Sequence, residues 1–366
     1  MAPGLTPIVF ADLAGFAGDD HFAAFQAYSR SAKAIDDGLA ATRPAQAASP
    51  AMQTIARIAA REAVDDRQAA RRFFERWFRP FTVDQGGGAA PGFVTGYFEP
   101  VLAGSIVRTS EFASPVLGRP SDLVTFAQGE SREGFAGLTG AQRTASGALL
   151  PYPERAEIEA TAERRQPILW LRDPVEVFLA QVQGSASVDL ADGRRVRLAY
   201  DGRNGQPYTS IGRILIETAE IAEKEMSLAS LKQWLRANGL APGGRARALM
   251  QANRSYVFFK LETKFDPNDG PMGGAGVALT ALRSIAVDRA LWPYGAPFWI
   301  DADLPWQGDA PTPFRRLMIA QDTGSAILGP ARADIFFGQG DEAGLRAGAI
   351  RHPARFAVLL PAETSP

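Results

Sequence analysis

Three aspartates in the last third of the chain lie in settings that suit a reactive acid. Asp288, Asp322 and Asp334 each fall within an apolar segment or beside a turn. Acidic side chains are seldom buried without a partner, so this placement indicates a hydrogen bond, a bound cation or a catalytic role. A carboxyl group that is partly removed from water has a raised pKa, and it can then donate a proton near neutral pH. The first expectation is therefore general acid–base chemistry at these positions.

The three aspartates differ in how well a structural role explains them. Asp322 precedes Thr323 and Gly324, which predicts a strand that runs into a tight turn, because glycine adopts backbone angles that other residues avoid. There the carboxyl group could simply bond to backbone amides of the turn, and Asp288 could do the same before the turn at residues 292–295. Asp334 is followed by three apolar residues and has no local capping role.

The triplet Asp322-Thr323-Gly324 also allows an aspartic protease, an enzyme in which two carboxylates share one proton. A two-lobed protease would need a second such triplet, and the chain contains no other. A homodimeric protease would be expected to have a short subunit. The protease interpretation is therefore disfavoured.

Composition excludes several other kinds of chemistry. The chain has no cysteine, which rules out thiol catalysis, disulfides and thiolate metal sites. Its two histidines, His21 and His352, lie in the terminal regions and are expected to be packing or surface residues, so neither a serine–histidine triad nor a multi-histidine metal site is expected. A net charge of −1 gives no basic face for a polyanion, so nucleic acid is not an expected partner. We expect no cofactor and no metal.

The elements that must position the aspartates change in character along the chain. The first eighty residues are predicted to be helical, with helices that begin after Asp20, at Ser49-Pro50 and after Asp66. A glycine-rich break at residues 84–88 follows, and the pattern then changes to short strands. Strands are predicted at 93–100, 183–188, 298–300, 317–320 and 356–360, with a hairpin over 188–200 around Asp192-Gly193.

Helices return in the middle of the chain. They are predicted over 213–226 and 227–238, the second capped by Ser227 and stopped by Gly239. The run Pro242-Gly243-Gly244 is a candidate domain boundary. Gly273 and Gly274 belong to a glycine-rich stretch that fits no nucleotide-binding pattern and predicts a tight chain passage.

Several motifs occur together in one order. They are Gly96-Tyr97-Phe98-Glu99-Pro100, Arg155-Ala156-Glu157-Ile158, Gln183-Gly184-Ser185, Asn204-Gly205-Gln206-Pro207-Tyr208-Thr209-Ser210, Asn253-Arg254-Ser255-Tyr256 and Arg283-Ser284-Ile285-Ala286-Val287-Asp288. From about residue 90 to its end, the chain resembles the membrane-bound lytic murein transglycosylase A family. The C-terminal part looks like the 3D domain, which is named for three aspartates, and these fall here on Asp288, Asp322 and Asp334.

The resemblance implies a mainly β fold with N-terminal helices. It implies a double-psi β-barrel, a smaller inserted β-rich domain, and a groove between them for a glycan strand. We expect the N-terminal helices and the first part of the barrel in residues 1–100, the inserted domain in 101–247, and the rest of the barrel in 248–366.

The resemblance also implies a reaction and roles for residues. Such enzymes cleave the β-1,4 bond between N-acetylmuramic acid and N-acetylglucosamine in peptidoglycan without water and leave a 1,6-anhydromuramoyl end. Asp334 matches the single acid that then acts as the base, Asp322 is expected to support it, and Asp288 to shape the site. The expected glycan contacts are Thr95, Tyr97, Gln183, Ser185 and Ser210, with packing as an equal alternative for Tyr97.

The resemblance further implies a periplasmic exotransglycosylase, although the motifs do not separate exo from endo cleavage. Many relatives carry an outer-membrane lipid anchor, and the N-terminal sequence here shows neither a signal peptide nor a lipid-bearing cysteine. We expect peptidoglycan strands as the partner and a monomer, and participation in cell-wall synthesis complexes stays open. An alternative is a wall-binding module on an endoglucanase- or expansin-like barrel that binds glycan without cutting it.

Overall fold

The computed structural model of the protein describes residues 4–84, 91–127 and 129–362. The chain divides into two compact units. The barrel unit contains the segments up to Phe98, from Pro267 to Gly338 and from Arg346 onward. The inserted unit contains Glu99–Asp266 and Gln339–Leu345. Each unit has its own sheet and its own core, and each is described separately below.

The barrel unit is built on a closed sheet. Its strands are β3 (Gly92–Glu99), β13 (Ser284–Val287), β14 (Pro297–Leu304), β15 (Thr312–Asp322), β16 (Arg332–Gln339) and β17 (Arg351–Pro361). Their order is β17-β14-β15-β13-β16-β3, and β3 pairs again with β17, so the described strands form a closed barrel. Strands β2 (Phe78–Asp84) and β1 (Gly4–Pro7) extend the sheet beyond β17. The predicted mainly β barrel is confirmed.

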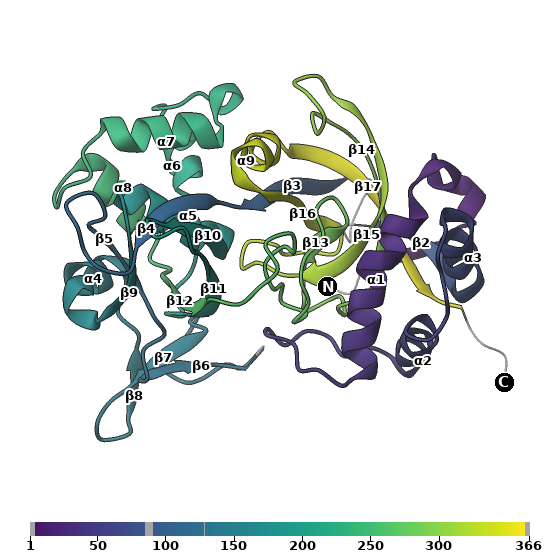
Figure 1. Cartoon of the computed structure of the whole chain (residues 1–366), viewed down its shortest axis with the longest axis horizontal. Helices are drawn as coiled ribbons and strands as arrows, with labels where there is room; N and C mark the ends of the chain where they lie inside the picture. The colour runs from purple at the N-terminus through teal and green to yellow at the C-terminus, as the bar shows by residue number, and fades with distance from the viewer. Residues whose placement is uncertain (1–3, 85–90, 128, 363–366) are drawn as a thin grey trace. The chain divides into compact units, whose positions relative to one another are not determined.

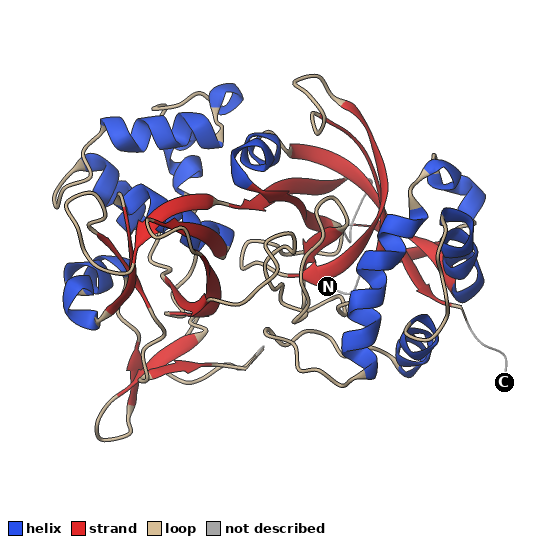
Figure 2. Ribbon diagram, viewed as in Figure 1, coloured by secondary structure: helices blue, strands red, loops and turns tan. Residues whose placement is uncertain are grey.

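Three helices precede the barrel strands, as the sequence predicted. They are α1 (His21–Asp36), α2 (Pro50–Ala59) and α3 (Arg67–Trp77). Their N-cap side chains, Asp20, Ser49 and Asp66, each accept a hydrogen bond from the backbone N–H three residues later, which satisfies a donor that the helix cannot. Figure 2 shows these helices grouped beside the barrel strands. Two 3₁₀ turns, η1 (Phe10–Asp12) and η2 (Phe16–Gly18), come before α1.

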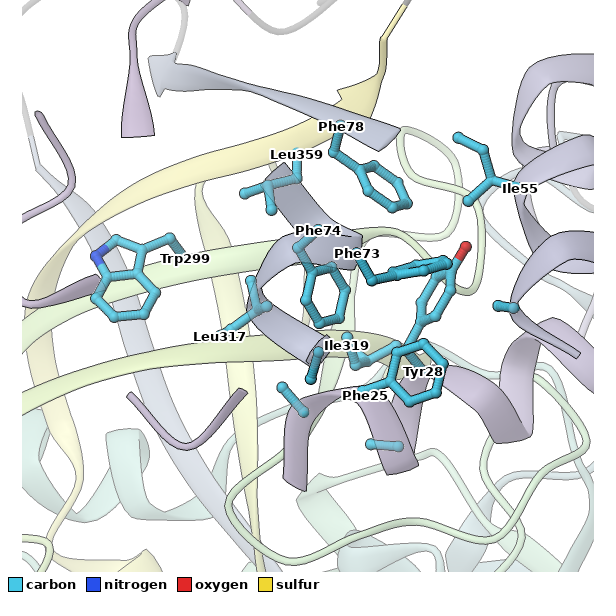
Figure 3. Close-up of a cluster of buried hydrophobic side chains, with 14 of the residues drawn as sticks. Phe25, Tyr28, Ile55, Phe73, Phe74, Phe78, Trp299, Leu317, Ile319 and Leu359 are labelled. Atoms are coloured by element: carbon cyan, nitrogen blue, oxygen red, sulfur yellow. The ribbon is translucent and has the colours of Figure 1, made fainter. Parts of the chain in front are cut away.

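The helices and the barrel share one aromatic core. Phe25 and Tyr28 of α1 meet Phe73 and Phe74 of α3, with ring centroids between 5.0 and 6.3 Å apart. Trp299, Leu317 and Leu359 of the barrel strands lie in the same cluster (Figure 3). Helix α1 also packs along β15, the strand that ends at Asp322 (Figure 1). This core therefore fixes the strand that carries one of the three aspartates.

The inserted unit has a second sheet, ordered β12-β11-β10-β4-β9-β5. Its strands are β4 (Val101–Ser105), β5 (Ser114–Leu117), β9 (Pro167–Leu171), β10 (Ser185–Leu190), β11 (Arg195–Arg203) and β12 (Val257–Glu262). An isolated bridge between Gly118 and Phe259 joins its two edges. A smaller sheet contains β6 (Leu123–Thr125), β7 (Gly140–Arg143) and β8 (Leu149–Pro151). The hairpin predicted around Asp192-Gly193 is confirmed as β10 and β11.

Helices complete the inserted unit. They are α4 (Arg155–Ala160), η3 (Ala162–Arg165), α5 (Pro174–Gln183), α6 (Ile211–Glu217), η4 (Glu223–Glu225), α7 (Leu228–Ala237) and α8 (Arg245–Ala252), while α9 (Gly340–Gly348) follows β16. Helix α7 agrees with the prediction, including its Ser227 cap. The run Pro242-Gly243-Gly244 joins α7 to α8 within this unit.

Two predicted elements differ from the structure. The helix predicted over 213–226 is shorter, because α6 ends at Glu217 and Ala219 then adopts a φ of 56°, outside the helical region. Gln183 is the last residue of α5 rather than part of a strand, since Gly184 ends that helix in the left-handed conformation and β10 begins at Ser185. Of the predicted break at 84–88, Asp84 ends β2 and the other positions lie outside the described residues.

Candidate active site

Strand register brings Asp322 and Asp334 to the same level of the barrel. Strand β13 lies between β15 and β16, and its Ala286 is the pairing partner of Asp322 on one side and of Asp334 on the other. Neighbouring strands are about 4.8 Å apart, so the two backbones are separated by roughly 10 Å. The barrel therefore places the two acids on either side of one short strand.

Strand β3 supplies a hydroxyl group to each of these acids. Thr95 and Tyr97 are two positions apart and hence share a face of the strand. The Thr95 hydroxyl donates to Oδ1 of Asp334 at 2.7 Å, and the Tyr97 hydroxyl donates to Oδ2 of Asp322 at 3.0 Å. The backbone N–H of Gly274 donates to Oδ1 of Asp322 at 2.8 Å. Asp322 is thus held by two donors, whereas Asp334 receives one of the two β3 hydroxyls.

Burial raises the pKa of Asp334 to about 6, and the neighbouring charges modify this effect. The Arg332 guanidinium and the Thr95 hydroxyl stabilise the ionised carboxylate and lower its pKa, whereas the negative charge of Asp322 raises it. The outcome is an acid that exchanges its proton about two pH units above an ordinary aspartate. Such a group can donate a proton and later take one back near neutral pH.

Arg332 is a member of this cluster that the sequence analysis did not identify. It lies two residues before Asp334 on β16 and donates through Nη2 to the Thr95 hydroxyl at 2.7 Å. It also donates to the carbonyl of Ala333, and its guanidinium lies 5.6 Å from the ring centroid of Phe93. Two-residue spacing on a strand, which puts Arg332 and Asp334 on one face, was the signal that could have identified it.

Tyr97 was predicted to contact glycan, and the structure places it inside the barrel unit instead of on its surface. Its side chain belongs to an apolar cluster with Leu279, Ala286, Ile327 and Phe336, and its ring lies 5.3 Å from that of Phe336. Burial, together with Asp322, raises the pKa of Tyr97 well above its usual range. The phenol therefore stays neutral and acts as a fixed donor to Asp322.

Asp288 holds the loop that joins the two other aspartates. Its Oδ1 accepts from the backbone N–H of Ala290, and its Oδ2 accepts from the backbone N–H of Gly329, both at 2.9 Å. Gly329 belongs to the connection between β15 and β16. The backbone-binding role that the sequence allowed for Asp288 is present, and it acts across the fold as well as locally.

A second loop braces the other side of Asp322. Gly273 and Gly274 pass close to the barrel: a Cβ on Gly274 would lie 2.3 Å from the Tyr294 hydroxyl, and one on Gly273 would lie 2.5 Å from the Gln321 carbonyl. This agrees with the tight passage predicted there. Arg43, which the sequence analysis also missed, donates to the Thr323 carbonyl at 2.7 Å, and the Thr42 hydroxyl donates to the Gly273 carbonyl at 2.9 Å.

The other predicted glycan contacts belong to the inserted unit. Ser210 is the N-cap of α6, where its hydroxyl accepts from the N–H of Arg213 at 3.3 Å. Ser185 is buried at the start of β10 and bonds to the Glu99 carboxylate. Gln183 ends α5. Of the predicted contacts, Thr95 and Tyr97 are therefore the two that contact the carboxylates within the barrel unit.

Residues 4–84, 91–127 and 129–362 contain no group of three histidine or acidic side chains placed to hold a metal ion. The same ranges contain no helix with the length and apolar composition that a membrane crossing requires.

Comparison with known families matches both parts of the chain. Residues 93–260 match the MltA specific insert domain, and residues 283–360 match the 3D domain. A membrane-bound lytic murein transglycosylase A of Vibrio cholerae is 32% identical over 280 residues, which are 74% of this chain and 66% of that protein. The matched segment thus spans slightly less than two thirds of this relative's own length.

Solved structures match along almost the whole chain. A membrane-bound lytic murein transglycosylase from Agrobacterium tumefaciens superposes with a TM-score of 0.86 at 33% identity, covering 98% of each chain. Escherichia coli MltA with bound chitohexaose gives a TM-score of 0.64 at 26% identity, covering 98% of this chain and 92% of that one. On the evidence of its barrel, its inserted unit and these matches, the chain belongs to the membrane-bound lytic murein transglycosylase A family.

Proposed function

We propose that this protein is a lytic transglycosylase that cleaves the glycan strands of peptidoglycan. The observation that carries the proposal is the half-buried Asp334, with a pKa raised to about 6, hydrogen-bonded to Thr95 and at the same barrel level as Asp322. The names of the V. cholerae and A. tumefaciens relatives support the same reaction class. The E. coli relative with bound chitohexaose supports a β-1,4-linked amino-sugar substrate.

In the proposed reaction Asp334 acts first as the acid. Its protonated carboxyl group gives a proton to the oxygen of the β-1,4 bond between N-acetylmuramic acid and N-acetylglucosamine, and the C1–O bond breaks. The resulting carboxylate accepts the proton of the C6 hydroxyl group as that oxygen attacks C1 of the same sugar. The product is a 1,6-anhydromuramoyl end, and Asp334 recovers its starting protonation state.

One acid suffices in this scheme because the nucleophile belongs to the substrate. Hydrolytic glycosidases use a second carboxylate to activate water or to attack the sugar. An attack by the C6 hydroxyl group of the same ring needs no second reactant, and its orientation is already fixed by the ring. Asp322, held by Tyr97 and Gly274, is assigned to maintaining negative charge near Asp334, and Asp288 to holding the β15–β16 loop.

Digestion of purified peptidoglycan sacculi tests the reaction. We expect soluble muropeptides with anhydro ends, each lighter by one water than the product of hydrolysis, as measured by liquid chromatography and mass spectrometry. Products with reducing ends would identify a hydrolase. Retention of the protein on sacculi without any soluble product would instead identify a wall-binding module.

Asp334→Asn tests the assignment of the acid. Loss of general acid–base assistance is expected to lower turnover by about 10² to 10⁴. The variant should fold at neutral pH, because it removes a carboxyl group whose charge burial disfavours. Asp189→Asn on β10, which changes an exposed aspartate paired with Arg195, is the matched control and should keep full activity. Full activity of Asp334→Asn would refute the assignment.

The remaining proposals concern substrate contacts and location. We assign Thr95, Gln183, Ser185 and Ser210 to glycan binding through neutral hydrogen-bonding groups, and Tyr97 to support of Asp322. The names of the relatives include the term membrane-bound, which supports association with a membrane, and we propose the periplasmic side of the outer membrane as the location. A monomeric exotransglycosylase is the proposed form.

A further inference from the structure

A cavity of the barrel unit lies at the other end of β15 from Asp322. It has a volume of about 390 Å³, and its lining includes residues just before α1, the first residue of α3, and Pro313, Arg315 and Arg316 of β15. Four arginines and two aspartates contribute to its wall, together with Trp306. Arg316 lies six residues before Asp322, so the cavity is roughly 20 Å along the strand from the acid site. It is therefore separate from the proposed catalytic cluster.

Most of the charges around this cavity are already paired. Asp19 accepts two hydrogen bonds from Arg283, at 2.8 and 2.9 Å, and a third from the backbone N–H of Leu317 at 2.9 Å. Arg315 donates to Asp301 at 3.0 Å, outside the cavity lining. The Asp20 carboxylate caps α1. Among the lining residues, Arg67 and Arg316 are therefore the two arginines that do not bond to a carboxylate. Asp20 is the lining aspartate that does not bond to an arginine.

Arg316 differs from the other arginines of the cavity. Its half-buried guanidinium lies 4.5 Å from the ring centroid of Trp306 and 5.8 Å from that of Phe314. Arg67, by contrast, donates to the carbonyls of Gly18 and Asp19. Among the described residues no carboxylate, carbonyl or hydroxyl group accepts a hydrogen bond from the Arg316 side chain, although a guanidinium carries five donors.

The surroundings of Arg316 contain charges of both signs. Arg283 is 2% exposed and is paired with Asp19, and its Nε is buried without a hydrogen-bond partner. Burial, together with the nearby charge of Arg283, lowers the pKa of Arg316, whereas the nearby charges of Asp19 and Asp20 raise it. The Trp306 indole N–H donates to the Pro313 carbonyl at 3.3 Å, which fixes the ring beneath the guanidinium. The donors of Arg316 are thus oriented before any ligand arrives.

We propose that this cavity is a binding site for an oxyanion, a carboxylate or phosphate group, with Arg316 as its principal ligand. A guanidinium stacked on an indole keeps its planar fork of donors free, and this fork matches two oxygens of such a group. The site does not depend on the proposed transglycosylase reaction, because it shares no residue with the acid cluster.

Isothermal titration of the full-length protein with sodium phosphate, sulfate and acetate, at constant ionic strength set by chloride, tests the proposal. We expect saturable binding of at least one oxyanion, and a loss of affinity of about 10-fold or more in Arg316→Gln. Arg316→Lys, which keeps the charge but not the fork, should bind more weakly than the wild type and more tightly than Arg316→Gln. The exposed Arg143 of β7 supplies the matched control, and Arg143→Gln should bind as the wild type does.

The titration also identifies the source of the oxyanion. Tighter binding of phosphate or sulfate than of acetate would point to a phosphate-bearing ligand, and the reverse to a carboxyl-bearing one such as a peptide terminus. Absence of saturable binding to the wild type by all three anions overturns the proposal whether or not the variants fold. Equal affinities for the wild type and a folded Arg316→Gln also overturn it, because binding would then lie elsewhere.

Discussion

Asp334 carries its carboxyl group among neighbours whose effects on its pKa oppose one another. Burial raises the pKa and the Asp322 charge adds to this, whereas Arg332 and Thr95 lower it. Were burial unopposed, the pKa would be higher still, and the acid would hold its proton more tightly and donate it less readily, although its carboxylate would be a stronger base. The opposing groups give a value of about 6, which suits a residue that must act in both directions.

The first prediction at this scale concerns pH. Under the proposed mechanism the free enzyme must hold a proton on Asp334, so kcat/KM should fall as pH rises through about 6. The measurement is the rate of anhydromuropeptide release from a soluble glycan fragment between pH 4.5 and about 8. A rate that keeps rising across pH 6 to about 8 would show that the titrating group is not this acid.

Arg332→Met supplies the second prediction. Loss of the cation removes the largest effect that lowers the Asp334 pKa, so the decline of kcat/KM should move to higher pH. Activity at the optimum should also fall, because the Thr95 hydroxyl loses the donor that orients it. Arg143→Met on β7 is the control and should leave the profile unchanged. A shift to lower pH in Arg332→Met would contradict the assignment.

The sequence pointed to the three aspartates directly, but it did not show which groups would bond to them. Asp322 and Asp334 were selected because carboxyl groups in apolar segments need an explanation, and that argument requires only neighbouring residues. The Thr95 hydroxyl that bonds to Asp334 is 239 residues away along the chain, so its role depends on barrel closure, which no local pattern encodes. Arg332 was missed for the same reason, because its bond to Thr95 joins residues that are 237 positions apart.

At the scale of elements, β3 is the strand that organises the site. It pairs with β17 on one side and β16 on the other, and it carries both hydroxyl groups that bond to the aspartates. Gly96 lies between Thr95 and Tyr97 and faces the opposite way. A Cβ there would meet backbone atoms of Ala347 in α9 at 2.8 Å, so helix and strand approach closely only because this residue is glycine.

Gly96→Ala therefore gives the third prediction. The added methyl group must push β3 away from Ala347, at a cost of about 1 to 3 kcal/mol in the free energy of unfolding. The same displacement should lengthen the bonds from Thr95 and Tyr97 and lower kcat. Urea unfolding and sacculus digestion measure the two effects. Gly18→Ala, where a Cβ would meet nothing within 4 Å, is the control for both measurements. An unchanged kcat in Gly96→Ala would show that the strand position is not critical.

The predictions of helices and strands succeeded where a capping residue marks the start of a helix. They failed where no sequence signal marks the end of a helix or the partner of a strand. Helices α1, α2 and α3 were found because Asp20, Ser49 and Asp66 are N-caps that bond within their own first turn. Helix α6 was predicted too long because the charged residues after Glu217 fit a helical face, while the backbone turns at Ala219. Sheet order was beyond local reasoning, since β13 pairs in parallel with β15 and antiparallel with β16.

At the scale of the whole molecule, a buried ion pair joins the N-terminal segment to the barrel. Asp19 precedes α1, and Arg283 precedes β13, with side chains that are 4% and 3% exposed. The third bond of Asp19, from the Leu317 N–H, connects the same carboxylate to β15. The pair thus fastens the helical segment onto the strand that ends at Asp322.

Asp19→Asn gives the fourth prediction. Removing one charge leaves Arg283 buried without a counterion, which should cost about 3 to 5 kcal/mol in the free energy of unfolding. The exposed pair of Asp189 and Arg195 is the control, and Asp189→Asn should cost less than about 1 kcal/mol. Urea unfolding at pH 7 measures both. Equal losses of unfolding free energy in the two variants would show that the buried pair contributes no more to stability than the exposed pair.

The difference in stability between the wild type and Asp19→Asn should change with pH in one direction. Although burial raises it, the pKa of Asp19 is held below 3.8 overall by hydrogen bonds and charge from Arg283. Its contribution to stability is therefore present above pH 3.8 and is lost as pH falls through the folded-state pKa. The stability difference between wild type and Asp19→Asn should shrink in strong acid.

The closure of β3 against β17 has a consequence for the order in which the protein matures. Thr95 pairs with Arg351, so the barrel cannot close until the chain has been made as far as Arg351. Thr95 emerges early in synthesis, but Asp334 and the strand that seals the barrel emerge late. Contacts between such distant segments form slowly. A chain synthesised only as far as Asp334 therefore lacks the closed barrel around this acid, and the proposed glycan cleavage would begin only after β17 has been made.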